Sequence, residues 1–148
     1  MRILMVCLGN ICRSPLAEGI LREKTKHLDL TIDSAGTAGY HIGKSPDPRA
    51  VAVAKKHDIN ISKLKARQFS RIDFENFDTI YVMDINNLSH LISLSSNAQE
   101  RNKIRLILNE IDPKNHDSVP DPYYDDNGFK KVYNMLNKAC EKIAIKIE

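Results

Sequence analysis

The chain has 148 residues, of which 42% are hydrophobic, and a formal net charge of +3 at pH 7. This length can bury a sizeable core, so we expect a single domain over residues 1–148. The charge is small and dispersed, and no apolar stretch is long enough for a signal-peptide core or a membrane span, so neither nucleic acid nor a membrane is an expected partner. The three cysteines are typical of a reducing compartment, and we expect a cytoplasmic protein.

Strands and helices are predicted to alternate along the chain. Short apolar runs predict strands near residues 2–6, 30–34, 79–83 and 104–108. Patterns of helical period predict helices near residues 15–26, 48–57, 86–94 and 128–147. The last of these helices carries its apolar residues on one stripe, which is typical of a helix that packs on a sheet. The alternation predicts an α/β fold, a three-layer sandwich with a parallel sheet and helices on both faces.

The first predicted strand leads directly into a loop of residues 7–15, with the sequence CLGNICRSP. Five residues separate Cys7 from Arg13, and a helix start follows: Ser14 is a good N-cap, and Pro15 suits the first helical position. A helix that begins there directs its positive end and its free N–H groups at the loop, which favours binding of an anion. The carboxyl end of a parallel strand is also where such sheets bind ligands.

A cysteine beside an arginine in this setting is suited to phosphoryl transfer. Arg13 and the helix N-terminus favour the thiolate of Cys7, which then needs no separate base. The planar fork of Arg13 can hold two phosphate oxygens, and a ring of backbone N–H groups supplies further stabilisation without a metal. Gly9 and Asn10 tolerate the left-handed backbone that lets successive N–H groups converge, and Ser14 can donate to the thiolate. We refer to residues 7–15 as the phosphate loop.

A candidate general acid lies in the later stretch VPDPYY, residues 119–124. Asp121 stands between two prolines, which stiffen the backbone and fix the reach of its carboxyl group. Alone, an acidic residue in such a place would indicate ordinary turn chemistry. Together with Cys7 and Arg13 it indicates proton transfer to a departing oxygen.

Three tyrosines could form the walls of a pocket for a phenyl phosphate. Tyr40 lies in an early loop, and Tyr123 and Tyr124 follow the candidate acid. Apolar walls are needed to guide the phosphorus of a phenyl phosphate down to a cysteine, and aromatic faces supply them. Tyr123 fits equally well as a residue that packs its loop onto the domain, whereas Tyr40 and Tyr124 favour substrate binding.

The segment CLGNICRSP followed by LAE resembles the signature of the low-molecular-weight protein tyrosine phosphatases, C-x-GN-x-CRSP-x-AE. Three further segments agree in order: DSAGTAGYHIGKSPDPRA at 33–50, ARQ with VMD-x-x-N within 66–87, and DPYYDD at 121–126. The resemblance implies a four-stranded parallel sheet in the order 2-1-3-4. It also implies hydrolysis of phosphotyrosine in protein substrates through a cysteinyl-phosphate intermediate, with inorganic phosphate as product.

The same resemblance implies a role for each matching residue. Cys7 is expected to be the nucleophile and Arg13 the phosphate clamp. Asp121 is expected to protonate the leaving phenol and then to deprotonate the attacking water. The implied substrate-binding residues are Leu8, Gly9, Asn10, Ile11, Cys12, Ser14, Tyr40, Tyr123 and Tyr124.

One position departs from the family pattern. Members usually have a histidine two residues before the ARQ segment, where it helps a serine to hold the loop asparagine in a strained conformation. This chain has Leu64 there. We expect Ser34 to hold Asn10 without that histidine.

The cysteines other than Cys7 have different interpretations. Cys12 is either a small filler beneath the loop or a thiol that forms a reversible disulfide with oxidised Cys7. A curled loop can bring the two Cα atoms within the limit of about 7 Å, and a reactive, accessible thiol is oxidised first. We expect the reversible disulfide. Cys140 lies in an amphipathic helical stretch and is expected in the core.

Three alternative functions share features with this sequence. A branch of the same family hydrolyses phosphoarginine and has a threonine where this chain has Ile11, whose apolar bulk favours a phenyl ring. Arsenate reductases of similar fold relay oxidation through two further cysteines, and only Cys140 lies beyond the loop. A non-catalytic phosphotyrosine-binding module would be favoured if Cys7, Arg13 or Asp121 were absent, and all three are present.

No metal or other cofactor is expected. Metal sites need clustered ligands, whereas the five histidines are scattered without ligand spacing: His27, His41, His57, His90 and His116. The small size and a cleft rimmed by aromatic residues are compatible with a monomer or a weak dimer.

Overall fold

One parallel sheet organises the computed structural model, which describes residues 1–114 and 117–148. Within this part of the chain the strands are β1 (Arg2–Cys7), β2 (Thr31–Gly36), β3 (Thr79–Val82) and β4 (Ile104–Leu106). Their order is β2-β1-β3-β4, and each neighbouring pair is parallel. The predicted parallel sheet and its order are therefore confirmed. β1 has a neighbour on each side, which is why its apolar run is fully buried.

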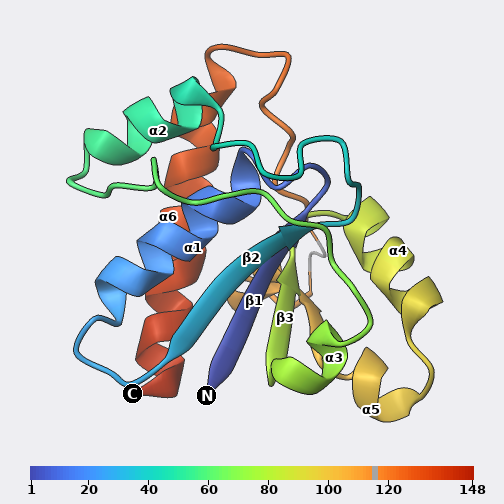
Figure 1. Cartoon of the computed structure of the whole chain (residues 1–148). Helices are drawn as coiled ribbons and strands as arrows, with labels where there is room; N and C mark the ends of the chain where they lie inside the picture. The colour runs from blue at the N-terminus through green and yellow to red at the C-terminus, as the bar shows by residue number, and fades with distance from the viewer. Residues whose placement is uncertain (115–116) are drawn as a thin grey trace.

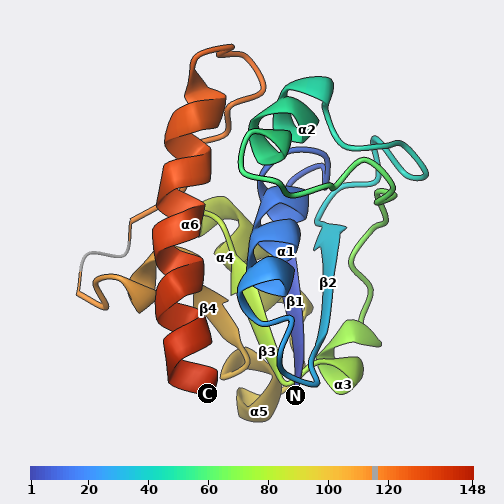
Figure 2. The ribbon, with the colours of Figure 1, turned by 90° about the vertical axis from the view of Figure 1, so that its left-hand side faces the viewer.

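Helices cover both faces of the sheet (Figure 1 and Figure 2). On one face α1 (Arg13–Lys24) and α6 (Gly128–Ile147) pack side by side, with α2 (Pro48–Lys55) beyond them. The other face carries α3 (Asp73–Asn76) and α4 (Ile85–Leu94), and α5 (Ala98–Arg101) precedes β4.

Successive residues of β1 point to opposite sides of the sheet and join different hydrophobic clusters. Ile3 and Met5 pack with residues of α1, α2 and α6. Leu4 and Val6 pack with residues of α3 and α4. This alternation is the two-residue period of a strand, and it confirms the predicted three-layer arrangement. Cys140 is buried in the first cluster, as expected.

The start of α1 differs from the prediction. The helix begins at Arg13, its N-cap is Cys12, and no side chain caps it. The prediction that Ser14 is the N-cap, with Pro15 at the first helical position, was wrong. The Ser14 hydroxyl contacts Cys7 and Asn10 instead, and this leaves the first backbone N–H groups of α1 without a side-chain acceptor.

Other helix and strand boundaries also differ from the predicted ones. β4 has only three residues, because the chain turns into a 3-10 helix, η1 (Ile107–Glu110), where the strand had been expected to continue. α2 ends at Lys55, two residues before the predicted end, and α3 and α5 were not predicted. In the part of the chain that the structure describes, no helix is both long enough and apolar enough to cross a membrane.

Candidate active site

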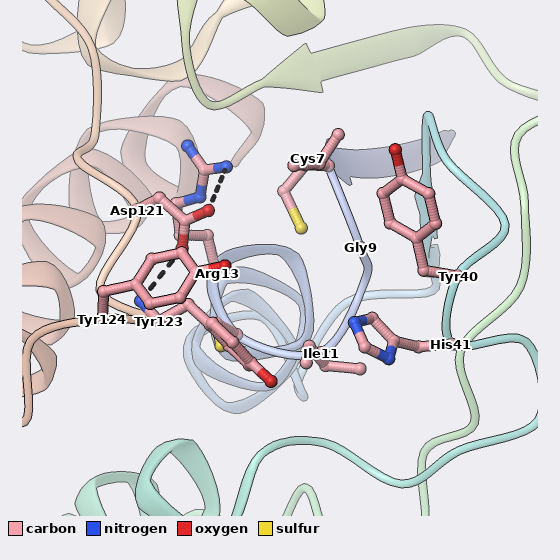
Figure 3. Close-up of a pocket in the computed structure, with 11 residues that line it drawn as sticks. Cys7, Gly9, Ile11, Arg13, Tyr40, His41, Asp121, Tyr123 and Tyr124 are labelled. Atoms are coloured by element: carbon pink, nitrogen blue, oxygen red, sulfur yellow. Dashed lines mark hydrogen bonds and ion pairs between the residues drawn. The ribbon is translucent and has the colours of Figure 1, made fainter.

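A pocket of about 290 Å³ lies at the carboxyl end of β1 (Figure 3). Three segments that are distant in the sequence meet there, and the lining residues are Cys7, Leu8, Gly9, Ile11, Cys12, Arg13, Tyr40, His41, Asp121, Tyr123 and Tyr124. The structure thus brings together all the predicted site residues except two. Asn10 and Ser14 do not line the pocket; both are buried behind it.

Cys7 is the last residue of β1, and its sulfur points into the pocket (Figure 3). The Sγ atom lies 3.0 Å from the hydroxyl oxygen of Ser14 and accepts the backbone N–H of Asn10 at 3.3 Å. Both contacts are buried. The sulfur thus lies against the Asn10 N–H and the Ser14 hydroxyl, beside the N-terminal end of α1.

Asn10 is held in the left-handed backbone region, with a φ of 59°. Its side-chain amide donates to the hydroxyls of Ser14 at 2.7 Å and of Ser34 at 3.0 Å, and its Oδ1 accepts the backbone N–H of Arg67 at 3.0 Å. These bonds on both ends of the amide fix an otherwise unfavourable conformation. Ser34 does hold Asn10, and Leu64 packs against the hydrophobic core instead of contributing a polar contact.

Gly9 does not adopt the left-handed conformation that the sequence suggested for it. Its missing side chain matters for space instead, because a Cβ at this position would lie 3.0 Å from Cδ2 of His41. Glycine therefore allows the imidazole of His41 to lie against the rim of the phosphate loop. His41 lines the pocket as well.

The hydrogen bonds behind the loop end at a buried carboxyl group on α1. The Ser34 hydroxyl donates to Glu18 at 2.6 Å, and Arg22 pairs with the same carboxyl group at 3.0 Å. Burial raises the pKa of Glu18, although the bonds from Ser34 and Arg22 act in the opposite direction. Glu18 is the last residue of the LAE segment that follows the phosphate loop, and no role was predicted for it. Glu18 lies in α1 shortly after the phosphate loop, and this closeness in the sequence is the signal that it lies beneath the site.

Arg13 is almost fully buried, with 3% of its side chain exposed. One guanidinium nitrogen donates to Asp84 at 2.6 Å and to the backbone carbonyl of Val119 at 3.0 Å, and the other lies 3.8 Å from Asp121. Burial acts to lower the pKa of Arg13, but the nearby Cys7, Asp84 and Asp121 outweigh it and raise the pKa. The cation is therefore fixed in orientation and always charged.

Asp84 was missed as a site residue by the sequence analysis. Its Oδ2 accepts from Arg13, and its Oδ1 accepts the backbone N–H of Asn87 at 2.7 Å as the N-cap of α4. The signal was present, because an acidic residue soon after β3 lies at the same sheet edge as Cys7.

Asp121 and the aromatic residues form the exposed part of the pocket. The Asp121 side chain is 41% exposed, and its Oδ1 accepts the backbone N–H of Tyr123 at 3.1 Å, so the residue makes a local turn and also faces Arg13. Tyr40 lies on the opposite side of the pocket from Tyr123 and Tyr124 (Figure 3). The two adjacent tyrosines contact each other edge to face, with ring centroids 5.0 Å apart. A flat ring can enter between these walls.

All three cysteines are free and buried. Burial is the main reason that the pKa of Cys12 is raised, and the neighbouring carboxylate of Asp47 adds to it. Cys12 lines the pocket beside Cys7 but is therefore held as a thiol. Burial also raises the pKa of Cys140, to about 12.

The described residues contain no group of three or more histidine, cysteine, aspartate or glutamate side chains that could hold a metal ion. His116 lies outside the described residues. His57 stacks on Tyr133 with ring centroids 4.0 Å apart.

Comparisons with known proteins give consistent results over nearly the whole chain. Residues 2–148 match the family model of the low molecular weight phosphotyrosine protein phosphatases. The low molecular weight phosphotyrosine protein phosphatase of Sus scrofa is 39% identical over 151 residues, which cover 98% of this chain and 94% of that protein.

Solved protein structures are also similar to this chain over nearly its whole length. A crystal structure of a protein tyrosine phosphatase from Entamoeba histolytica, with Hepes in its active site, has a TM-score of 0.92 and 38% sequence identity, covering 99% of this chain and 96% of the other. The structure of a Drosophila arginine phosphatase has a TM-score of 0.91 and 32% identity, covering 100% and 98%.

Proposed function

The chain belongs to the low molecular weight phosphotyrosine protein phosphatase family and is a protein-tyrosine-phosphatase, and on this premise we propose how its own residues act. Cys7 is the nucleophile, Arg13 clamps the phosphate, and Asp121 transfers the proton. The observation that carries these roles is the meeting of the three side chains, from distant parts of the sequence, in one pocket (Figure 3).

In the first step the Cys7 sulfur forms a bond to phosphorus while the bond from phosphorus to the tyrosine oxygen breaks. The electron pair of the broken bond goes to that oxygen, which takes the proton of Asp121. Arg13 and the backbone N–H groups of the phosphate loop hold the equatorial oxygens as their charge builds up. Because no side chain caps α1, its first N–H groups are available to the phosphate.

In the second step a water molecule attacks the cysteinyl phosphate. Asp121, now a carboxylate, accepts a proton from the water while the water oxygen bonds to phosphorus. The bond from phosphorus to sulfur breaks, and the electron pair returns to Cys7 as a thiolate. Inorganic phosphate leaves, and no metal takes part in either step.

The substrate is proposed to be phosphotyrosine in a protein chain, held between Tyr40 on one side and Tyr123 and Tyr124 on the other. Ile11 lines the pocket and gives it an apolar side suited to a phenyl ring. The similarity to a Drosophila arginine phosphatase makes phosphoarginine the second candidate substrate. Ile11 favours the phenyl ring over a guanidinium, which would need polar partners.

The test is turnover of matched phosphotyrosine and phosphoarginine peptides, in buffer with EDTA. We expect hydrolysis of the phosphotyrosine peptide at an unchanged rate in EDTA, and trapping of phosphate on Cys7 in rapid-quench experiments. Faster hydrolysis of phosphoarginine would reverse the substrate assignment. Loss of turnover in EDTA, or phosphate trapped on another residue, would contradict the mechanism.

The proposal includes the setting in which the enzyme works. It acts as a single domain over residues 1–148, in the cytoplasm, as a monomer or a weak dimer. Cell fractionation tests the location, and sedimentation over a range of concentrations tests the oligomeric state. A stable dimer at low concentration would contradict the proposal.

The enzyme is also proposed to be redox-sensitive, through a reversible disulfide between Cys7 and Cys12. Both thiols line the same pocket, and a mild oxidant would reach Cys7 there. Treatment with peroxide should stop turnover, and a thiol reductant should restore it. In the Cys12→Ser variant, recovery should be much less complete, because further oxidation of Cys7 is irreversible.

A further inference from the structure

Residues 120–127, which we call the acid loop because they carry Asp121, are exposed at almost every position. Most of their hydrogen bonds are local: Asp125 donates to the carbonyl of Pro122, and Asn127 donates to the side chain of Asp125. Local turns of this kind shape a loop but do not fix where it lies on the protein. Pro122 is the one buried residue among 120–127, so further contacts are needed to hold the loop over the pocket.

Arg49, the second residue of α2, makes this connection. Its guanidinium donates to the backbone carbonyl of Tyr123 at 2.8 Å and to the carboxylate of Asp126. Among the described residues, the other hydrogen bond from residues 121–126 to a helix or strand comes from the N–H of Gly128, where the loop runs into α6, to the carbonyl of Asp125 at 2.9 Å. The same guanidinium lies over the rings of Tyr123 and Phe129, 5.7 and 4.7 Å from their centroids.

The other end of the connection leads to the phosphate loop. The Nε and Nη2 atoms of Arg49 hold the carboxylate of Asp47 at 3.0 and 2.9 Å, and the backbone N–H of Asp47 donates to the carbonyl of Ile11 at 2.8 Å. The bonds from Arg49 lower the pKa of Asp47, although the burial of this carboxyl group acts to raise it. One guanidinium thus spans the distance from the phosphate loop to the acid loop.

We propose that Arg49 is a positioning residue for proton transfer: it holds the acid loop against the phosphate loop and thereby sets the reach of the Asp121 carboxyl group. Tyr123 links the two residues, because its N–H donates to Asp121 and its carbonyl accepts from Arg49. Arg49 does not line the pocket, so it acts on the substrate only through the acid loop. This role rests on the proposed function of Asp121 as general acid.

Arginine is the residue type that this position requires. The contacts to Asp47, Tyr123 and Asp126 leave the guanidinium in different directions, and the rigid, planar fork meets them together. A lysine has one point charge and would satisfy only part of the set. We therefore expect Arg49→Lys to recover only a part of what Arg49→Ala loses.

The test measures kcat/KM on aryl phosphates that range from a good leaving group, p-nitrophenol, to a poor one, phenol. In Arg49→Ala we expect a loss of about tenfold on phenyl phosphate and of less than about threefold on p-nitrophenyl phosphate, because a misplaced acid matters most where the leaving group needs a proton. The inhibition constant of inorganic phosphate should stay the same, because Arg13 and the phosphate loop hold that ligand. A uniform loss on all esters would overturn the proposal.

A double-mutant cycle separates this role from a general structural one. If Arg49 acts through Asp121, Arg49→Ala should change the activity on phenyl phosphate by less than about twofold when Asp121 is already asparagine. Equal losses in both backgrounds would overturn the role of Arg49 but leave that of Asp121 intact. If Asp121→Asn alone did not affect phenyl phosphate selectively, both roles would be overturned.

Two further variants distinguish the proposed role of Arg49 from a general loss of the fold. Asp126→Asn removes the charge of one partner at an exposed position and should give a smaller loss with the same dependence on the leaving group. Arg71→Ala is the matched control: Arg71 bonds Ser96 and Glu100 and lies over the ring of Phe74, away from the pocket. It should leave the dependence on the leaving group unchanged, and a change as large as in Arg49→Ala would contradict the proposal.

Discussion

The phosphate loop and the acid loop meet at one pocket but are held in opposite ways. In the phosphate loop, Cys7, Asn10 and Ser14 are buried and bonded to one another and to the sheet. In the acid loop Tyr124 is 94% exposed, and Arg49 of α2 bonds the backbone carbonyl of Tyr123. The part that stabilises charge is thus rigid, whereas the part that must admit a protein substrate lies at the surface.

This difference predicts two patterns of loss. Changes in the phosphate loop should affect all esters alike, because every substrate has the same phosphate. Changes in the acid loop should affect esters in proportion to their need for a proton. The variants below test that contrast, from the largest expected effect to the smallest.

Replacement of the nucleophile should have the largest effect. Cys7→Ser should lower kcat by at least about 10⁴-fold on every ester, because a serine hydroxyl in this pocket has no base to activate it. Binding of inorganic phosphate, measured by calorimetry, should persist, because Arg13 and the backbone N–H groups remain. Steady-state turnover near the wild-type rate would exclude Cys7 as the nucleophile.

Arg13→Lys keeps the charge but should lower kcat/KM by about 10²- to 10³-fold. The single ammonium group of a lysine cannot bond Asp84 and two phosphate oxygens together, as the planar guanidinium can. The loss should be the same for phenyl phosphate and p-nitrophenyl phosphate. Phosphate should also inhibit this variant more weakly. A loss confined to poor leaving groups would mean that Arg13 acts with the acid loop. It would contradict the predicted difference between the two loops.

Asp121→Asn should lower kcat/KM by about 10²-fold on phenyl phosphate, at the low end of what general acid catalysis contributes. The loss on p-nitrophenyl phosphate should be several times smaller. If both esters lost activity equally, Asp121 would not be the acid.

The smallest effect is expected at Glu18, at the far end of the bonds behind the phosphate loop. Burial raises the pKa of Glu18 above its ordinary value of 4.5, so its contribution to stability is complete below pH 4.5 and is lost as the pH rises through the raised pKa. Relative to the wild type, Glu18→Gln should therefore become more stable as the pH increases from 4.5 to neutrality. Urea unfolding of both proteins at several pH values measures this, and parallel pH curves would contradict it.

Local patterns in the sequence predicted the main elements but not their order or the shortest ones. The apolar run of β1 and the apolar stripe of α6 are local signals, because burial acts on each element separately. The order of the strands depends on long-range packing and came from the family resemblance. α3 and α5 have four residues each, too few to show a helical period, so the surrounding structure decides their conformation.

The candidate site was predictable where chemistry requires a particular residue type close to a motif. Cys7 and Arg13 lie in one short loop, and Asp121 lies between two prolines. Asp84 and Arg49 were missed, because they act through contacts between residues 71 to 77 positions apart that leave no pattern in the sequence. The error at Ser14 has a similar origin: a good N-cap residue was recruited by the buried network instead.

The two oxygens of Asp84 place a narrow chemical demand on one position. One of them starts α4, a task for which aspartate, asparagine, serine and threonine are suited and glutamate is not. The other orients a buried guanidinium, which calls for a negative charge that asparagine, serine and threonine lack. Aspartate is the one standard amino acid that satisfies both requirements. A substitution at this position therefore cannot change the N-cap of α4 without also changing the orientation of Arg13, or the reverse.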